Sequence, residues 1–239
     1  MTPRHVVIAG GSRGIGAACA ARFAAAGDRV SVLSRSEGIR VDLREAGAVA
    51  AALQQAEAAQ GPTDVLVCTA GAARQAPTSA LDAAALREGM EAKYFPYANI
   101  IMAALPGMAA RGRGVIVPVI GMGGKVASPT HLPGGAANAA LMLLTSGLGH
   151  AYAASGIRVV GVNPGPVATA RFDQLLAARA AQDGLSPEAA RNAVTAGLPA
   201  GAVPTPEQLA EIVHFLAGDG AVMLNGTVIA ADGGAVPVI

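Results

Sequence analysis

Short apolar runs alternate with alanine-rich stretches along almost the whole chain, and this alternation restricts the possible folds more than any other feature. Runs rich in valine and isoleucine have the length of buried strands, at residues 5–10, 29–34, 64–70, 114–120, 157–165 and 226–234. The stretches between them predict helices at about 14–26, 45–60, 82–110, 134–154 and 206–217. Continuous apolar strands joined by helices indicate a parallel sheet with both faces covered. The expected fold class is therefore α/β, with a doubly wound parallel sheet.

One domain is expected to account for residues 1–239, because no repeat, linker or low-complexity segment divides them. Residues 170–202 depart from the strand–helix alternation and contain two helical stretches, the second with Ser186 as a cap and Pro187 in its first turn. They follow a strand end, where open α/β sheets bind ligands. We expect this segment to be a substrate lid, the alternative being ordinary packing helices.

The low charge content bears on partners and location. Only 14% of residues are charged, against about 25% in typical soluble domains. So little charge favours a surface covered by other subunits, which predicts a homodimer or homotetramer. A net charge of +1 gives no long-range field for nucleic acid. No apolar stretch reaches the roughly 20 residues of a membrane span, so a cytoplasmic protein without a membrane partner is expected. Cys19 and Cys68 are expected to be buried thiols.

A glycine-rich loop, "AGGSRGIG" at residues 9–16, joins the first predicted strand to the first predicted helix. Glycines let a backbone turn tightly and approach a pyrophosphate, and the amides of a helix N-terminus favour its negative charge. This placement predicts a dinucleotide site of the Rossmann type. The alternative is a tight strand–helix turn that binds nothing.

Further segments occur in a fixed order along the chain: "VDL" at 41–43, "CTAG" at 68–71, "LPGM" at 105–108, "GVIV" at 114–117, "NPGPVAT" at 163–169 and "ADGG" at 231–234. Together with "GGSRGIG" they resemble the motifs of the short-chain dehydrogenase/reductase family over nearly the whole chain. The resemblance implies nicotinamide dinucleotide binding and a small-molecule alcohol or carbonyl substrate. The cofactor-binding residues that it implies are Gly10, Ser12, Arg13, Gly14, Ile15, Gly16, Asp42, Leu43, Ala70, Gly71, Asn138, Pro164, Gly165, Val167 and Thr169.

The residues after the second strand favour NADP(H) over NAD(H). A carboxylate there would hold the ribose diol of NAD, but this chain has Ser34 and Arg35. A guanidinium pairs with a 2′-phosphate through charge-assisted hydrogen bonds, and Arg13 can approach the same phosphate. The alternative is that both arginines are solvated surface residues.

The segment 36–41 is too short for the helix that the family usually has there, because a crossover needs about ten or more residues. We expect this helix to be missing, the adenine side to be more open, and cofactor affinity to be lower.

The usual catalytic residues of the family are absent. The flanking motifs align Gly121 with the family's Ser, Gly134 with its Tyr and Asn138 with its Lys. A general acid with a tuned pKa is therefore missing from its usual place. The lost Tyr predicts extra room for a ligand or water beside Gly134, and Asn138 can still hydrogen-bond the ribose.

Two other residues are candidates for proton transfer. Lys93 stands where the family has an Asn, so Asn and Lys are exchanged between positions 93 and 138. Its ammonium can reach the vacated space and, in a dry pocket, shuttle protons; the alternative is a surface lysine. His131 lies in the loop before Gly134 and titrates near neutral pH; the alternative is a polar or surface contact. Tyr97 shares a helix face with Lys93 and is expected in the core or an interface.

Three functions remain open from the sequence. The first is an NADP(H)-dependent oxidoreductase with an atypical active site. The second is a catalytically silent dinucleotide-binding or scaffold protein, favoured by the joint loss of Ser, Tyr and Lys. The third is non-redox chemistry in an enlarged pocket, which no residue specifically supports.

Overall fold

A six-stranded parallel sheet forms the centre of the computed structural model, which describes residues 3–71, 73–74 and 78–237. Its strand order is β3-β2-β1-β4-β5-β6, made of Ile39–Arg40, Arg29–Ser34, His5–Ala9, Val65–Cys68, Gly114–Pro118 and Ile157–Val159. A parallel pair, β7 (Gly161–Pro164) and β8 (Val228–Ala231), continues from β6. A bridge between Val119 and Val162 links this pair to the main sheet. The predicted doubly wound α/β fold is confirmed.

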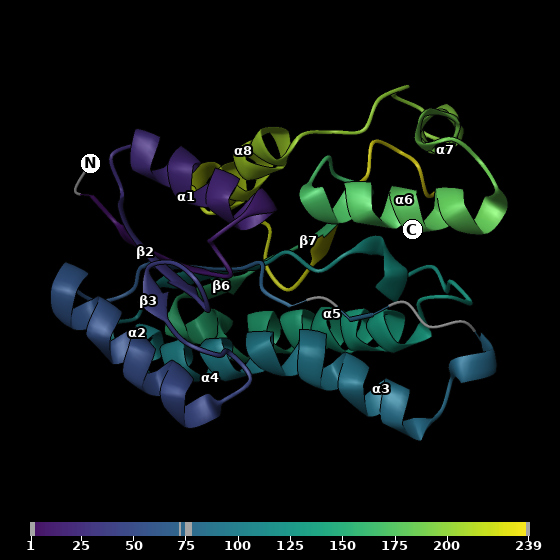
Figure 1. Ribbon diagram of the computed structural model, residues 1–239. Helices are drawn as coiled ribbons and strands as arrows, with labels where there is room; N and C mark the ends of the chain where they lie inside the picture. The colour runs from purple at the N-terminus through teal and green to yellow at the C-terminus, as the bar shows by residue number, and fades with distance from the viewer. Residues whose placement is uncertain (1–2, 72, 75–77, 238–239) are drawn as a thin grey trace.

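Helices cover both faces of this sheet, as Figure 1 shows. One face carries α1 (Gly14–Ala25) and α8 (Pro206–Leu216), and the other carries α2 (Ala46–Gln60), α4 (Phe95–Ala110) and α5 (Leu132–Tyr152). Strand β1 serves both cores, because alternate side chains point to opposite faces. Its Val6 and Ile8 pack in the core that includes α1 and α8, while Val7 and Ala9 pack in the other core. This double burial explains why the strands read as continuous apolar runs.

The predicted helix 82–110 is confirmed as one continuous helical stretch, but one turn in its middle is π-helical. The structure has α3 (Ala83–Gly89), a π-helical turn η2 (Met90–Tyr94) and then α4. Single π turns inside helices occur frequently at functional sites. Gly89 is buried just before this turn, and a Cβ there would lie 2.7 Å from Pro133 at the start of α5. The turn therefore sets the position of Lys93 relative to the start of α5.

The expected loss of a helix after β2 is confirmed. Only residues 35–38 connect β2 to β3, and the paired stretch is two residues long, Leu33 with Ile39 and Ser34 with Arg40. Such a short parallel connection needs an abrupt turn. Gly38 provides it with φ +67, at a point where a Cβ would overlap the carbonyl oxygen of Val32.

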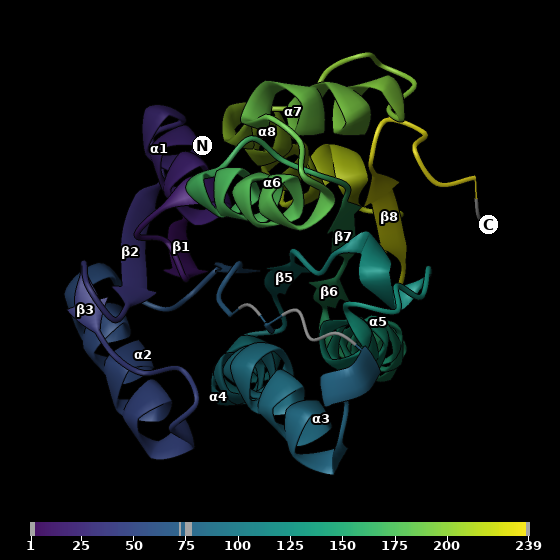
Figure 2. The same ribbon diagram turned by 45° about the vertical axis from the view of Figure 1, so that its right-hand side comes forward.

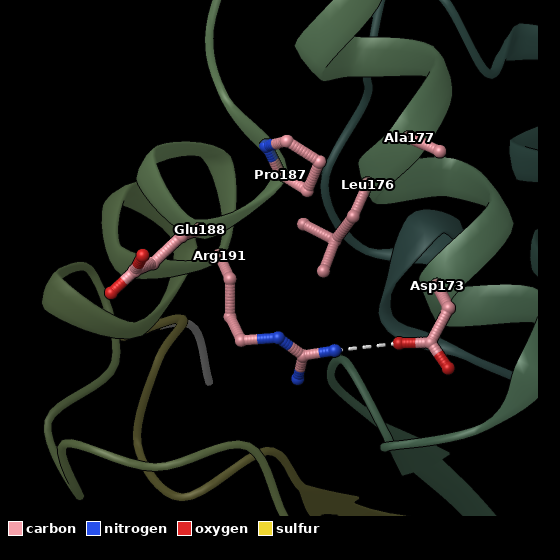
Figure 3. A pocket seen from close by; sticks show the side chains of 6 residues that line it. All are labelled: Asp173, Leu176, Ala177, Pro187, Glu188 and Arg191. Atoms are coloured by element: carbon pink, nitrogen blue, oxygen red, sulfur yellow. Dashed lines mark hydrogen bonds and ion pairs between the residues drawn. The ribbon is translucent and has the colours of Figure 1, made fainter.

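The segment after β7 forms two helices, α6 (Ala170–Asp183) and α7 (Pro187–Ala196), which lie beyond the strand ends in Figure 2. As expected, Ser186 caps α7 by accepting a hydrogen bond from the backbone N–H of Ala189. Arg191 on α7 pairs with Asp173 on α6 at 2.6 Å (Figure 3). A hollow of about 270 Å³ lies between the two helices and contains none of the predicted site residues. Its lining residues are Asp173, Leu176, Ala177, Pro187, Glu188 and Arg191.

Short 3-10 turns complete the chain at Thr78–Ala80 (η1), Met122–Gly124 (η3), Ala153–Ser155 (η4) and Asp219–Ala221 (η5). Within the described ranges, none of the helices combines the length and the apolar character that crossing a membrane requires.

Candidate active site

The glycine loop forms a close-packed cradle at the end of β1. Gly10 has φ +95, and a Cβ on it would lie 2.6 Å from both the Cα and the backbone nitrogen of Ala70. A Cβ on Gly16 would overlap the carbonyl oxygen of Gly10 and lie 2.5 Å from Oγ1 of Thr69. The Thr69 hydroxyl donates to the carbonyl oxygens of Ala9 and Gly10. Two predicted cofactor segments, 9–16 and 68–71, are thus brought into contact, and only glycine fits at the junction.

The segment after β7 lies against the same cradle. Gly14 has φ +53, and a Cβ there would lie 3.3 Å from Cγ2 of Thr169. Val167 is buried in the same core cluster on which the partly buried Ile15 packs. Thr169 caps α6 by accepting from the backbone N–H of Phe172 at 3.3 Å. The third predicted cofactor segment, 163–169, therefore also meets the glycine loop.

The arginines predicted to hold a 2′-phosphate are exposed. Arg13 and Arg35 form no ion pair with any described residue. Asp42 lies near Arg35 and pairs with Arg44 at 2.5 Å. The hydrogen bonds from Arg44 lower the pKa of Asp42 to about 2, and the charge of Arg35 contributes. Leu43 is buried, and its carbonyl oxygen accepts from Nδ2 of Asn99 at 3.0 Å.

Ser34 has a different role from the predicted phosphate contact. Its buried hydroxyl donates to the carbonyl oxygen of Glu37 at 2.7 Å. The same oxygen accepts from the backbone N–H groups of Ser36 and Glu37. All of its hydrogen-bonding capacity is used in the turn that replaces the missing helix. The Ser34 side chain is therefore a determinant of the turn, and the phosphate prediction rests on the two arginines.

The space beside Gly134 is filled, which corrects the prediction of extra room there. His131 precedes α5 and folds its ring back over the first turn of that helix. A Cβ on Gly134 would overlap Cε1 and Nε2 of His131, and Cδ2 would lie 3.1 Å away. The imidazole thus occupies the volume in which a side chain of residue 134 would begin. The glycine and the histidine are sterically complementary.

The His131 ring is half-buried and incompletely bonded. Its Nδ1 is buried and has no hydrogen-bond partner among the described residues. Burial is the main cause that lowers the pKa of His131 below its usual 6.5, followed by the charges of Arg171 and Lys93. The ring is therefore neutral at neutral pH, with a nitrogen that the described residues leave available to a partner.

Lys93 is buried in the π turn, so the surface alternative is wrong. The residue is 8% exposed. Its Nζ donates to the Tyr97 hydroxyl at 2.8 Å and to the carbonyl oxygen of Val119 at 3.3 Å. Burial, followed by the charge of Arg171, lowers the pKa of Lys93 to about 7. The ammonium points toward Tyr97 and Val119, while the space beside Gly134 belongs to His131.

Tyr97 lies in the core, as its helix face predicts, and is fully buried. Its hydroxyl accepts from Lys93 and donates to the carbonyl oxygen of Val119 at 2.6 Å. The Lys93 Nζ also lies 4.3 Å from the centroid of the Tyr97 ring. Among the described residues no carboxylate joins these hydrogen bonds. No negative charge therefore holds Lys93 in its ammonium form.

Asn138 and Gly121, which the sequence aligns with the family's Lys and Ser, lie together in the structure. Asn138 is buried, and its Nδ2 lies 3.3 Å from the position of a Cβ on Gly121. Its Oδ1 has no hydrogen-bond partner among the described residues. The backbone N–H of Gly121 donates to Oδ1 of Asn163 at 3.1 Å. Asn163 was missed from the sequence, although a polar residue at the end of an apolar strand was a usable signal.

Arg171 is a second residue that the sequence reasoning missed. It lies in the first turn of α6, and its Nη2 donates to the carbonyl oxygen of Ala73 at 3.1 Å. Burial lowers the pKa of Arg171, and the charge of Arg13 lowers it further. The side chain therefore connects α6 to the loop after β4, between the glycine loop and the residues around Gly134. Its position directly after "NPGPVAT" was the available signal.

Both cysteines are buried and free, as expected. Burial raises the pKa of Cys19 to about 12 and that of Cys68 further. Neither is a reactive thiolate at neutral pH. Across the described residues, no three His, Cys, Asp or Glu side chains gather in a group that could hold a metal ion.

Comparison with known proteins gives a consistent result. The model of the short chain dehydrogenase family matches residues 4–180. The cis-4-hydroxycyclohexanecarboxylate dehydrogenase of Sinomonas cyclohexanicum is 36% identical over 249 residues, which cover 97% of this chain and 96% of that protein. The inactive 2-(S)-hydroxypropyl-CoM dehydrogenase 2 of Xanthobacter autotrophicus is 34% identical over 217 residues, or 91% of this chain and 90% of that one.

Solved structures agree with these matches. A variant of the actinorhodin polyketide ketoreductase, crystallised with NADPH, superimposes with a TM-score of 0.94. It is 27% identical, and the match covers 99% of this chain and 98% of the ketoreductase.

Proposed function

The chain belongs to the short-chain dehydrogenase family, and from this membership we propose that it is an NADP(H)-dependent oxidoreductase in which His131 is the proton donor and acceptor. An oxidoreductase of alcohol or carbonyl substrates that uses a nicotinamide dinucleotide follows from the family itself. The preference for NADP(H) and the atypical site are our proposals. One observation carries the assignment to His131, namely its imidazole in the volume that a side chain at position 134 would occupy.

The residues at the phosphate end fit the cofactor. A Cβ at Gly10 or Gly16 would overlap neighbouring atoms of the cradle. Because glycine has no Cβ, the backbone amides of the loop are left open to a pyrophosphate. Arg13 and Arg35 are exposed and have no ion-pair partner in the described part of the chain, which suits a 2′-phosphate. When bound, the nicotinamide ring would accept a hydride from a carbinol carbon or donate one to a carbonyl carbon.

The proton of the reaction is assigned to His131. In the oxidation direction the neutral imidazole accepts the proton of the substrate hydroxyl, and in the reduction direction the imidazolium returns it to the carbonyl oxygen. The lowered pKa of His131 keeps the accepting form populated at neutral pH. Asn138 is the positioning partner, because its buried amide lies where the family has a charged residue and can still hydrogen-bond the ribose.

Lys93 is assigned to proton exchange behind the reacting groups. With a pKa of about 7 it is populated both as ammonium and as amine at neutral pH. Its hydrogen bond to Tyr97 fixes Nζ, and its charge is felt at the imidazole of His131. The amine form can take up a proton that leaves His131, directly or through a water.

Calorimetric titration with NADPH and NADH in parallel is the first test. Tighter binding of NADPH, weakened in Arg13→Ala and Arg35→Ala, is the expected result. Binding of neither cofactor would contradict the proposal.

Turnover is tested next on cis-4-hydroxycyclohexanecarboxylate, which the name of one relative gives as that protein's substrate, and on a panel of other alcohols and carbonyls. His131→Ala is expected to lower kcat by about 10²- to 10⁴-fold with NADPH binding unchanged. The exposed His150, in the last turn of α5, gives a matched control, since His150→Ala should leave both quantities unchanged. Wild-type turnover in His131→Ala would refute the assignment.

A catalytically silent dinucleotide-binding protein is the second candidate. It is favoured by Gly121 and Gly134, which carry no reactive group, and by the relative whose name describes it as inactive. Tight NADPH binding without turnover of any alcohol or carbonyl in the panel would select this function.

A homodimer or homotetramer is part of the proposal. Large apolar side chains such as Leu143 and Met223 are 76% and 90% exposed in the single chain, which suits a surface covered by subunits. The mass in solution by light scattering tests this, and a monomer would contradict it.

A further inference from the structure

Four cationic or proton-binding side chains lie close enough together to influence one another's charge, and the described residues give them no acidic partner. They are Arg13, Lys93, His131 and Arg171, and none of them forms an ion pair with a carboxylate among the described residues. Five other arginines do form ion pairs with carboxylates, for example Arg4 with Asp28 at 2.7 Å. Unbalanced positive charge in a cleft attracts an anion and raises its local concentration.

Arg171 is the member of this group that is placed to bind an anion directly. Among the described residues its guanidinium makes one hydrogen bond, from Nη2 to the carbonyl oxygen of Ala73, and its other N–H groups have no partner there. The residue as a whole is exposed, so a ligand can reach it. The planar fork of a guanidinium matches a carboxylate, which it binds through two parallel hydrogen bonds.

Arg171 lies close to Lys93 and His131. Ala73 follows Gly71, which packs against the backbone of Lys93, with a Cβ on Gly71 only 3.2 Å from the Lys93 Cα. The charge of Arg171 is also felt at both Lys93 and His131. The phosphates of a cofactor already have the glycine cradle, Arg13 and Arg35. Arg171 therefore lies near Lys93 and His131, the residues proposed to transfer protons, which is where a residue that anchors the substrate has to lie.

We propose that the substrate carries a carboxylate, separate from its reacting alcohol or carbonyl, and that Arg171 binds this carboxylate. This inference rests on the oxidoreductase function proposed above. Arg171 would act as a specificity-determining residue, because a neutral substrate leaves its free N–H groups and the surrounding positive charge uncompensated. The lid would then close on the anion, since Arg171 belongs to the first turn of α6.

Binding without turnover provides the test. The protein, saturated with NADPH, is titrated by calorimetry with acetate, benzoate and cyclohexanecarboxylate, each beside its neutral amide. At least one carboxylate is expected to bind about 10-fold or more tightly than its amide. Arg171→Met should remove this preference and Arg171→Lys should retain part of it. The exposed Arg87 on α3 gives a control of equal charge, and Arg87→Met should behave as wild type.

The outcomes separate this inference from the proposed function. No preference for any of the three carboxylates over its amide would overturn the anchor, even in an active enzyme. A large loss of NADPH affinity in Arg171→Met with the carboxylate preference intact would assign Arg171 to the cofactor phosphates and also overturn it. A carboxylate preference that depends on Arg171 in a protein without turnover would support the anchor while refuting the oxidoreductase.

Discussion

The two ends of the candidate active site are shaped by different parts of the polypeptide, main chain at one end and side chains at the other. At the phosphate end the shape is made by backbone, where Gly10 and Gly16 leave no room for a Cβ against neighbouring main-chain atoms. At the reaction end the shape is made by side chains, where the ring of His131 covers Gly134 and the Lys93 stem fills the core beside Tyr97. A cradle of main-chain atoms tolerates almost no substitution, whereas a pocket of side chains can exchange one functional group for another if volume is kept. The difference would allow a chain to keep the family's cofactor motifs while the side chains at the reaction end change, as the atypical site proposed above requires.

The largest effect is expected from a methyl group in the backbone cradle. Gly16→Ala places a Cβ against the Gly10 carbonyl oxygen. We therefore expect the free energy of unfolding to fall by about 3 kcal/mol and the affinity for NADPH to fall by more than about 100-fold. Denaturant unfolding and calorimetry measure the two. Gly47→Ala in α2 is the matched control, because nothing lies within 4 Å of its Cβ position. It should raise stability by about 0.5 kcal/mol. If Gly16→Ala binds NADPH as tightly as the wild type, the main-chain cradle does not exclude a side chain at position 16, and this part of the comparison is wrong.

A smaller effect is expected when the family's tyrosine is restored. Gly134→Tyr forces a Cβ into the His131 ring, and overpacking of this kind costs about 1–3 kcal/mol. His131→Ala in the same chain should relieve most of this cost, since the two residues compete for one volume. A double-mutant cycle by denaturant unfolding measures the coupling. If the two costs simply add, the imidazole and residue 134 do not share space.

At the phosphate end one predicted cofactor contact depends on a side chain, that of Arg35. Arg35→Ala is expected to weaken NADPH binding by about 10-fold, or 1.4 kcal/mol, and to leave NADH binding unchanged. The readout is the ratio of the two dissociation constants. Arg87→Ala on α3 controls for the change in net charge. Equal loss for both cofactors would mean that Arg35 contributes general attraction and no selectivity.

The smallest effect is expected in the pH dependence of stability. Lys93 has a folded pKa of about 7 against an ordinary 10.5, so above pH 7 the unfolded chain binds more protons than the folded one. Stability must then rise with pH. Relative to Lys93→Met, the wild type should gain about 1 kcal/mol of unfolding free energy between pH 7 and pH 8. Parallel denaturant unfolding at the two pH values tests this, and a constant difference would mean that Lys93 titrates normally.

The sequence predicted features that depend on local chemistry. The strands follow from apolar runs, the turn at Gly10 and Gly16 from glycine spacing, and the absent helix at 35–38 from chain length alone. The π turn at Met90–Tyr94 was not predictable, because the apolar pattern of 82–110 continues through it. The position of the His131 ring depends on a side-chain rotamer set by the packing around Gly134, and the direction of Lys93 depends on Tyr97 and the strand end at Val119. Arg171 was missed because its hydrogen-bond partner, the carbonyl oxygen of Ala73, lies in a loop that is distant in the sequence.

The short connection at residues 35–38 has a practical consequence. Where related folds place a helix beside the adenine, this chain has a turn closed by Gly38 and the internal hydrogen bonds of Ser34. A cofactor bound as proposed would meet no helix at that edge. We therefore expect the protein to accept NADP(H) that is immobilised through its adenine ring.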